Sequence, residues 1–234
     1  MLVVRNAWNG WVLGLNRAVH QELRARPSAF FVVTDCDILP PIPDSTGRCW
    51  LERLHSLMEQ HVCVGKLGLA LDLGYIASRP GFEETLRREL SIQAGPPLGE
   101  LVVASVYTTL ALYRSDLFVT ERPWFLPGHQ SLYRPYYYCC RTAPEFRAKH
   151  LSWRRYESQA VADMHSKLWC FTLCGAALDP VFLGRVGAWR RWTYKLLRPV
   201  ARTLWGLIGV ALHMRYFVLS LPRDFNRIQS ARRL

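Results

Sequence analysis

The first 34 residues alternate between strand-like and helix-like patterns, and this alternation constrains the fold more than any other feature of the chain. Residues 2–4 (LVV) are β-branched and apolar, which predicts a short strand. Residues 11–26 predict an amphipathic helix, because an apolar residue stands at every fourth position: Trp11, Leu15, Val19 and Leu23. Residues 30–33 (FFVV) predict a fully buried strand. Strand, helix and strand in this order predict a βαβ unit in a parallel sheet.

The following segments continue the mixed pattern. Residues 50–61 predict a helix whose apolar face holds Leu51, Leu54, Leu57 and Met58. Strand-like, helical and again strand-like segments follow at residues 62–73, 81–90 and 100–114, the last long enough for one or two strands. We therefore expect an α/β domain over residues 1–156 and a separate α-helical extension over residues 157–234.

Two aspartates stand one residue apart at the end of the strand-like run, in FFVVTDCDILPP (residues 30–41). In an extended chain, Asp35 and Asp37 would lie on the same side, and ligands of open α/β sheets bind beyond the carboxyl ends of strands. Two carboxylates at this edge are suited to Mg²⁺ or Mn²⁺, which bind through one or two carboxylates plus substrate phosphates. The alternative is that both residues only solvate the strand end before a proline-rich turn.

A series of short motifs resembles one enzyme family over about residues 3–155. The motifs are RNAWNGWVLGLNRAV, FFVVTDCDILPP, VGKLGLALDLGYI, FEETLRREL, VYTTLALYR and KHLSW. In this order they resemble the nucleotide-sugar half of family 2-type glycosyltransferases of the GT-A fold. The resemblance implies a GT-A-like (Rossmann-like) mixed sheet flanked by helices. It also implies transfer of a sugar from a nucleoside-diphosphate-sugar donor to a glycan or lipid-linked acceptor.

The same resemblance implies roles for individual residues. Asp37, and less directly Asp35, would hold the Mn²⁺ or Mg²⁺ that bridges the donor diphosphate, and His150 would approach the same metal. The implied substrate-binding residues are Asn6, Asn9, Asn16, Asp35, Thr108 and Thr109. Without the resemblance, His150 would be an ordinary surface or buried histidine, and Asn6 and Asn9 would shape a turn.

Transfer to an acceptor hydroxyl with inversion also needs a general base. The candidates are Glu83, Glu84 and Asp72, with Glu83 favoured because Phe82-Glu83 stands where the family usually has Trp-Glu. The alternative is that Glu83 and Glu84 are acids in the first turn of a helix, where the helix dipole favours them.

Two departures from the family pattern lead to a second hypothesis. Tyr107 stands where the family has an aspartate before Thr-Thr, and the family's first strand would lie before Met1. The alternative function is therefore a catalytically inactive GT-A-like binding or scaffold protein.

The positive charge is concentrated in the C-terminal part of the chain. Residues 1–146 contain 14 acidic and 14 basic residues, whereas residues 147–234 contain 16 basic and four acidic ones. This asymmetry predicts an anionic partner for the C-terminal region. Residues 203–221 are apolar and nearly long enough to span a bilayer, but Arg215 within them argues against a clean span.

The segment before that apolar stretch has the pattern of an interfacial helix. Its basic stripe is Arg191, Lys195, Arg198 and Arg202, and its opposite side holds Trp189, Trp192, Leu196 and Val200. Such a helix is typical of an anionic membrane surface, and Pro199 predicts a kink or a restart. The alternative is that the helix packs on the catalytic domain with a solvated basic face. Nucleic acid is not the expected partner, because the arginines alternate with bulky apolar residues that need burial.

The cysteines bear on the compartment. The chain has seven, with no Cys-x-x-Cys pair and no histidines at zinc spacing. Several stand in apolar runs, as buried reduced thiols do, which predicts a reducing cytoplasm. Together with the basic helix, this predicts a cytoplasmic protein that is peripheral at the inner face of the cell membrane.

Overall fold

The structure, a computed structural model, describes residues 16–43, 47–106, 110–117, 138–154, 161–178 and 180–231. The chain divides into two compact units. The smaller comprises residues 1–27, 120–129 and 157–214, and the larger comprises residues 28–119, 130–156 and 215–234. The units share the predicted junction near residue 156, but each also takes in segments from both sides of it.

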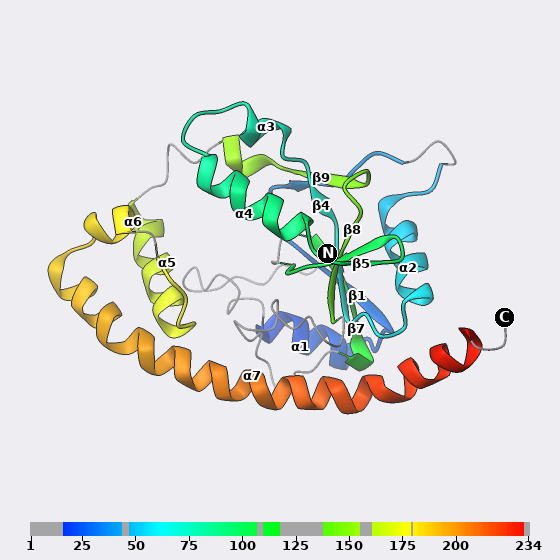
Figure 1. The fold of residues 1–234 in the computed structure, drawn as a ribbon. Coiled ribbons are helices and arrows are strands. Elements are labelled where there is room, and N and C mark those ends of the chain that lie inside the picture. Colours follow the sequence, from blue (N-terminus) through cyan, green and yellow to red (C-terminus); the bar gives the residue numbers. More distant parts are fainter. Residues whose placement is uncertain are drawn as a thin grey trace. The chain divides into compact units, whose positions relative to one another are not determined.

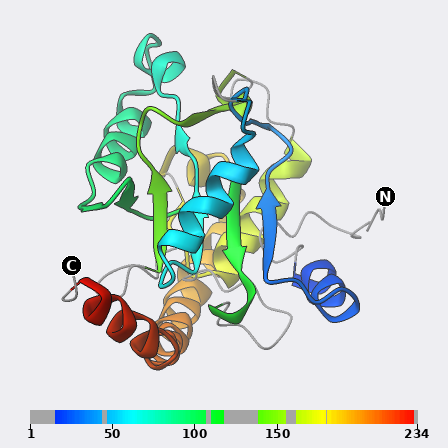
Figure 2. The ribbon, with the colours of Figure 1, turned by 90° about the vertical axis from the view of Figure 1, so that its right-hand side faces the viewer.

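Among the described residues, the larger unit is built on a six-stranded mixed sheet with the order β1-β7-β3-β8-β6-β5. Strands β3 and β8 run parallel, and every other pair in this sheet is antiparallel. Figure 2 shows the opposite directions of β1 and β7. The strands are β1 (Phe30–Thr34), β7 (Leu110–Arg114), β3 (Lys66–Gly68), β8 (Cys139–Thr142), β6 (Leu101–Val103) and β5 (Pro97–Leu98).

A second, three-stranded sheet of the described residues brings distant segments of the larger unit together. Its order is β2 (Ile38–Leu39), β9 (Arg147–His150) and β4 (Ala70–Leu71). The central strand β9 pairs antiparallel with β2 and parallel with β4. This sheet therefore places the segment after the Asp-x-Asp motif beside the segment that ends in His150.

Helix α2 (Trp50–Gln60) covers one face of the six-stranded sheet (Figure 2). Its side chains Leu54, Leu57 and Met58 are buried in the main core, as the sequence predicted, whereas Leu51 is 39% exposed. The Cys49 N–H donates to the Glu52 carboxylate at 2.9 Å, which satisfies one of the donors at the helix start. The unit also contains α3 (Gly74–Ala77), α4 (Glu83–Gln93) and 3₁₀ turns at Ser115–Leu117 and Leu151–Arg154.

Three predictions for the strands need correction. Strand β1 forms, but only Val33 within it is buried, because β7 is its one neighbour among the described residues. Its pairing with β7 is antiparallel, in a sheet that is mixed and not parallel. The predicted strand at residues 2–4, and with it the βαβ unit, lies outside the described residues. The stretch 62–73 forms two short strands, β3 and β4, separated by Leu69. Residues 100–114 were expected to form one or two strands, and they form two, β6 and β7.

No disulfide joins the seven cysteines, all of which lie in the described part of the chain. Five of them are buried, which confirms the expectation of buried thiols for most of the set: Cys63, Cys139, Cys140, Cys170 and Cys174.

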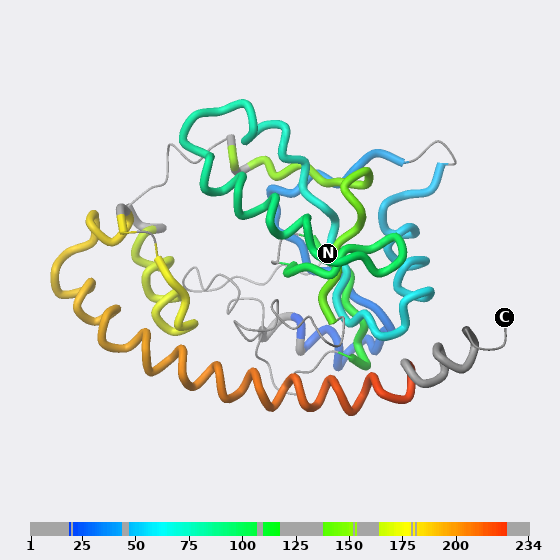
Figure 3. Tube along the Cα trace, viewed as in Figure 1, coloured from blue at the N-terminus to red at the C-terminus, as the bar shows by residue number. Residues whose placement is uncertain are grey.

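The smaller unit is helical in its described part. It contains α1 (Asn16–Ala25), α5 (Val161–Leu173), α6 (Pro180–Gly184) and the first part of α7 (Ala188–Ala231), whose last residues belong to the larger unit. The restart predicted at Pro199 is wrong, because α7 continues through this residue without interruption (Figures 1 and 3). The Thr203 hydroxyl donates to the Pro199 carbonyl at 3.1 Å, one turn further along.

One side of α7 is fixed to the segment that follows α5. The Tyr194 hydroxyl and the Arg198 guanidinium both donate to the Ala176 carbonyl at 3.1 Å. The Trp205 indole N–H donates to the Leu173 carbonyl at 2.6 Å. Arg198 was expected in the lipid-facing basic stripe. In the structure it is half-buried, because its guanidinium donates to the Ala176 carbonyl in the segment that follows α5.

Gly175 allows this close approach, and we expect Gly175→Ala to destabilise the protein. Gly175 has φ +69°, and a Cβ there would lie 2.6 Å from the Arg202 Cα. The expected loss in the free energy of unfolding is about 1–3 kcal/mol, from backbone strain and overpacking. The matched control is Gly206→Ala in α7, where a Cβ would meet nothing within 4 Å. This change should stabilise by up to about 1 kcal/mol. Equal effects in chemical denaturation would refute the explanation.

Of the described helices, one is long and apolar enough to cross a membrane, over Ala188–Arg223 with a mean hydropathy of 1.5 in its best window. Length and composition alone are weak evidence, because a core helix of a soluble protein passes the same test. Only 11% of that window is buried, which is unlike a core helix.

Candidate functional site

The structure brings Asp37 and His150 together across the three-stranded sheet. Asp37 directly precedes β2, and His150 ends β9, where it pairs with Ile38. The Leu151 N–H donates to the Asp37 carbonyl at 2.8 Å, which fixes the two segments to each other. The His150 Nδ1 lies 3.7 Å from the Asp37 Oδ2. Asp37 and His150, which the family resemblance assigns to one metal, therefore form one acid–imidazole pair.

Trp153 holds the His150 ring in place. The two rings are stacked, with centroids 5.0 Å apart and planes 10° from parallel, and Trp153 is buried. The spacing His-Leu-x-Trp produces this contact, because the chain turns into a 3₁₀ helix directly after His150. Burial lowers the pKa of His150 below its usual value of 6.5, although Asp37 and Glu89 act in the opposite direction. The imidazole is therefore neutral near pH 7 and can act as a metal ligand.

Asp35 does not share this position. The expected extended geometry is wrong, because β1 ends at Thr34 and the chain turns at Cys36 and Asp37. The Ile38 N–H donates to the Asp35 carbonyl at 3.4 Å across this turn. Period-two alternation therefore does not apply, and the two carboxylates are not carried to one side by an extended chain.

The described side chains around Asp37 offer few donor atoms to a metal ion. Among the described residues, no group of three or more His, Cys, Asp and Glu side chains is placed to hold one. Mg²⁺ and Mn²⁺ commonly take only one or two protein ligands and complete their shell with phosphate oxygens and water. Asp37 and His150 fit that arrangement as a pair, because a carboxylate oxygen and a nitrogen of a neutral imidazole lie 3.7 Å apart.

Asp72 follows β4 and lies beside β9. Its N–H donates to the Ala148 carbonyl at 2.8 Å, and its Oδ1 accepts from the Gly74 N–H at 3.0 Å. The Arg147 guanidinium lies 4.0 Å from the same oxygen. In this geometry Asp72 shapes the turn into α3.

Glu83 and Glu84 begin α4, and both are exposed. The Glu83 Oε1 accepts from the Gly81 N–H at 3.0 Å. Bonds to its own N–H and to that of Gly81 lower the pKa of the Glu83 carboxyl. This is the behaviour of an acid at a helix start, the alternative role considered from the sequence.

The remaining predicted site residues lie outside the described residues or in the smaller unit. Asn6, Asn9, Thr108 and Thr109 lie outside the described residues, as does Tyr107. Asn16 is the first residue of α1, in the smaller unit, and its side chain is outside the described part.

Sequence reasoning missed a polar row on one face of the six-stranded sheet. The register aligns one residue from each of β1, β7, β3 and β8, namely Phe31, Tyr113, Lys66 and Cys139, and the last three of these are polar. Their neighbours Leu67, Leu112 and Cys140 lie in the apolar core on the other face. Lys66 is 1% exposed, and its ammonium lies 5.0 Å from the centre of the Tyr113 ring. A lone lysine in an otherwise apolar run was the signal available in the sequence.

Two buried cations hold the backbone that leads into residues 107–109. The Lys66 Nζ donates to the Val106 carbonyl at 2.6 Å, and the Arg141 Nε donates to the Ser105 carbonyl at 2.8 Å. The pKa of Lys66 is lowered to about 8, mainly by burial and with a contribution from Arg141, although Cys139 and Asp35 oppose the shift. The Asp35 carboxylate therefore raises the pKa of Lys66, whereas the Asp37 carboxylate raises the pKa of His150.

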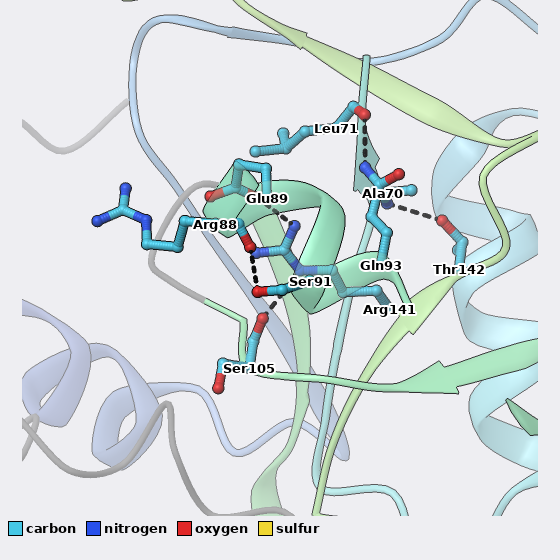
Figure 4. A network of polar contacts seen from close by, with 9 residues as sticks. All are labelled: Ala70, Leu71, Arg88, Glu89, Ser91, Gln93, Ser105, Arg141 and Thr142. Carbon is cyan, nitrogen blue, oxygen red and sulfur yellow. Dashed lines mark hydrogen bonds and ion pairs between the residues drawn. The ribbon is translucent and has the colours of Figure 1, made fainter. Parts of the chain in front are cut away.

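Arg141 also joins β8 to α4 through a buried ion pair (Figure 4). Its Nη1 lies 3.0 Å from the Glu89 Oε2, and the two side chains are 2% and 3% exposed. Glu89 stands at a buried position of α4, in register with Phe82, Leu86 and Gln93 at spacings of four, three and four residues. A glutamate at helical spacing from apolar residues is the sequence signal that could have predicted the burial of Glu89.

The pKa of Lys66 leads to a prediction for pH-dependent stability. Because its folded-state pKa is about 8 and the ordinary pKa of a lysine is 10.5, the unfolded state binds more protons between these pH values. Stability therefore rises with pH across this window, and the full cost of burying the charge is present below it. We expect the free energy of unfolding of the wild type, relative to Lys66→Met, to rise by up to about 3 kcal/mol.

The matched control for this prediction is Lys149→Met, which removes an exposed lysine of β9. Its difference from the wild type should stay flat over the same window. Denaturant unfolding at a series of pH values measures both differences, and a flat difference for Lys66→Met would refute the buried, charge-dependent role of Lys66.

Comparison with known proteins adds nothing to this geometry, because no family model, no curated protein and no solved structure matches the chain.

Proposed function

We propose that this protein is a metal-assisted glycosyltransferase that moves a sugar from a nucleoside-diphosphate-sugar to a glycan or lipid-linked acceptor. The observation that carries the proposal is the pairing of Asp37 with His150, at 3.7 Å, from two motifs that resemble the same family. The mixed α/β architecture, with a mixed sheet flanked by helices, is compatible with a GT-A-like fold, which is part of the proposal.

Asp37 and His150 would hold a Mn²⁺ or Mg²⁺ ion, which would neutralise charge on the departing diphosphate. In the net reaction the bond between the anomeric carbon and the diphosphate oxygen breaks, and its electron pair leaves with the nucleoside diphosphate. The acceptor oxygen bonds to the anomeric carbon, and its proton passes to a base. Glu83, Glu84 and Asp72 are the candidate bases. Trp153 keeps the His150 ring oriented toward Asp37.

Lys66 and Arg141 would position the backbone before Tyr107, Thr108 and Thr109, the segment that the family resemblance assigns to substrate. Their bonds to Val106 and Ser105 fix the start of this segment from the buried side. The proposed location is the cytoplasmic face of the cell membrane, where a lipid-linked acceptor would be met. The support for a membrane location is the long apolar helix in the C-terminal part of the described chain.

The test is divalent-cation-dependent release of nucleoside diphosphate from a panel of nucleotide sugars. Calorimetric titration with nucleoside diphosphates and Mn²⁺ separates the alternative, an inactive GT-A-like binding or scaffold protein, from the enzyme. Binding without turnover on any donor would favour the scaffold. If the protein shows neither binding of a nucleoside diphosphate nor turnover of a nucleotide sugar, both the enzyme and the scaffold hypotheses are refuted.

A further inference from the structure

The part of α7 in the smaller unit carries an apolar stripe that its own unit does not cover. The stripe is defined as Trp189, Trp192, Leu196, Val200, Leu204 and Leu207, at spacings of three or four residues. These side chains are 53–74% exposed, and the same spacing continues to Met214. A run of this spacing forms one face of a helix. Exposed apolar side chains in such a contiguous row mark an interaction surface.

The opposite side of this part of α7 is already occupied. Tyr194 is 4% exposed, and Tyr194, Arg198 and Trp205 donate hydrogen bonds to the carbonyls of Ala176 and Leu173. The apolar stripe is therefore what remains after packing within the unit, and the contacts fix which way it faces. A helix held in this way presents one face to a partner and does not offer its whole circumference to lipid.

The charge of α7 indicates the partner. Between Ala188 and Arg223 the sequence has seven Arg and Lys residues and no Asp or Glu. Lys195 and Arg202 are exposed and seven residues apart, so they lie two turns apart on one flank of the helix, between the apolar stripe and the packed side. Trp189 and Trp192 are stacked on each other at its N-terminal end, with ring centroids 5.4 Å apart. Tryptophan and long cationic side chains at the edge of an apolar face are suited to the level of lipid headgroups.

Two other occupants fit these observations less well. A second copy of α7 would place cations against cations along the seam, without the opposite charges that helix pairs use beside an apolar stripe. Nucleic acid would engage the cations but leave the tryptophan and leucine side chains in water. A spanning orientation of residues 203–221 would carry Arg215 into the bilayer and would remove the bond from Trp205 to the Leu173 carbonyl.

We propose that α7 lies in the plane of an anionic lipid bilayer, with the apolar stripe among the acyl chains and Lys195 and Arg202 at the level of the phosphates. This inference rests on the proposed function in one respect only, namely that the membrane face is the cytoplasmic one. Vesicle binding requires neither donor nor acceptor, so its failure and the failure of sugar transfer are separate results.

The experiment is flotation of the full chain with vesicles of phosphatidylcholine alone or with about one third phosphatidylglycerol. We expect the apparent affinity to be at least about tenfold higher for the anionic vesicles at low salt, since each engaged cation contributes about fivefold. Lys195→Gln with Arg202→Gln should remove most of that difference. Equal binding of the wild type to both vesicles would overturn the anionic part of the proposal.

The apolar stripe is tested by Val200→Glu with Leu207→Glu, which change residues that are each 67% exposed. We expect binding to anionic vesicles to fall at least about tenfold, because two charges would enter the apolar layer. The matched controls are Ile42→Glu and Leu90→Glu, at exposed apolar positions of the larger unit, which should stay within about twofold of the wild type. Circular dichroism verifies that each variant retains its helix content. A double variant that binds like the controls would overturn the proposal.

Two further results would also overturn it. Retention of the protein on vesicles after washing with alkaline carbonate would show a spanning helix. Failure to bind vesicles, together with a stable dimer in sedimentation that Val200→Glu with Leu207→Glu dissociates, would assign the apolar stripe to a second copy of the chain. Release by carbonate and a monomer in the absence of vesicles support the in-plane orientation.

Discussion

Asp37→Asn is expected to lower the rate of nucleoside-diphosphate release by about 100- to 1,000-fold with the best donor of a panel. The substitution keeps the size of the side chain but removes the charge that would help to hold Mn²⁺ or Mg²⁺ beside His150. Metal stabilisation of a leaving diphosphate is worth several kcal/mol, and each 1.4 kcal/mol is about tenfold in rate. Initial rates at saturating Mn²⁺ measure the effect.

The chain offers a closely matched control for this variant. His55 and Glu59 form a second acid–imidazole pair, also at 3.7 Å, but on the surface of α2 with no link to the proposed site. Glu59→Gln should leave the rate within about twofold, since exposed pairs of this kind contribute little. Equal rates for the wild type and Asp37→Asn would contradict the proposed role of Asp37. Equal losses in both variants would show a general effect of removing a carboxylate.

Glu89→Gln is expected to lower the free energy of unfolding by about 3–5 kcal/mol. The change leaves the Arg141 guanidinium charged and almost fully buried, and an uncompensated buried charge is the costly outcome of breaking such a pair. A loss of this size is a large part of the total stability of a typical domain. Urea denaturation followed by circular dichroism measures it.

Two comparisons separate the buried charge from other causes. Replacing both partners, as in Glu89→Leu with Arg141→Met, should cost less than Glu89→Gln alone, because no charge is then left buried. Glu100→Gln removes the carboxylate that Arg53 contacts at an exposed site, where Glu100 is 60% exposed, and should cost at most about 1 kcal/mol. If Glu89→Gln were as mild as Glu100→Gln, the ion pair would not anchor α4 to β8.

Local patterns predicted the regular elements well where one face is apolar. Helix α2 was expected at residues 50–61 and spans Trp50–Gln60, because the spacing of Leu54, Leu57 and Met58 fixes its buried face. The patterns could not supply the partners of β1. Its pairing with β7 depends on a segment far along the chain, and short-range periodicity carries no information on such contacts.

The candidate site was predicted in part. The pairing of Asp37 with His150 was expected from the motif order, and the second sheet brings it about. The prediction that Asp35 and Asp37 lie on the same side of an extended chain was wrong, because a turn begins directly after β1 and the chain is not extended there. No periodicity encodes where a strand ends before a proline-rich turn.

Buried charges were the largest omission. Lys66, Glu89 and Arg141 were passed over because charged residues are rarely buried, and only tertiary contacts show what they bind. The basic stripe of α7 shows the reverse error. All of its residues were expected to face lipid headgroups, but Arg198 donates to Ala176 within its own unit, while Lys195 and Arg202 are exposed.

The central claim is that Asp37 and His150 form the metal edge of a sugar-transfer site. It is tested most directly by the rate of nucleoside-diphosphate release from a panel of nucleotide sugars, with Mn²⁺ and with a chelator, for the wild type, Asp37→Asn and His150→Ala. The account predicts Mn²⁺-dependent release of at least one diphosphate by the wild type and a loss of about 100-fold or more in Asp37→Asn. Release that is unchanged by the chelator, and equally fast in both variants, would contradict it.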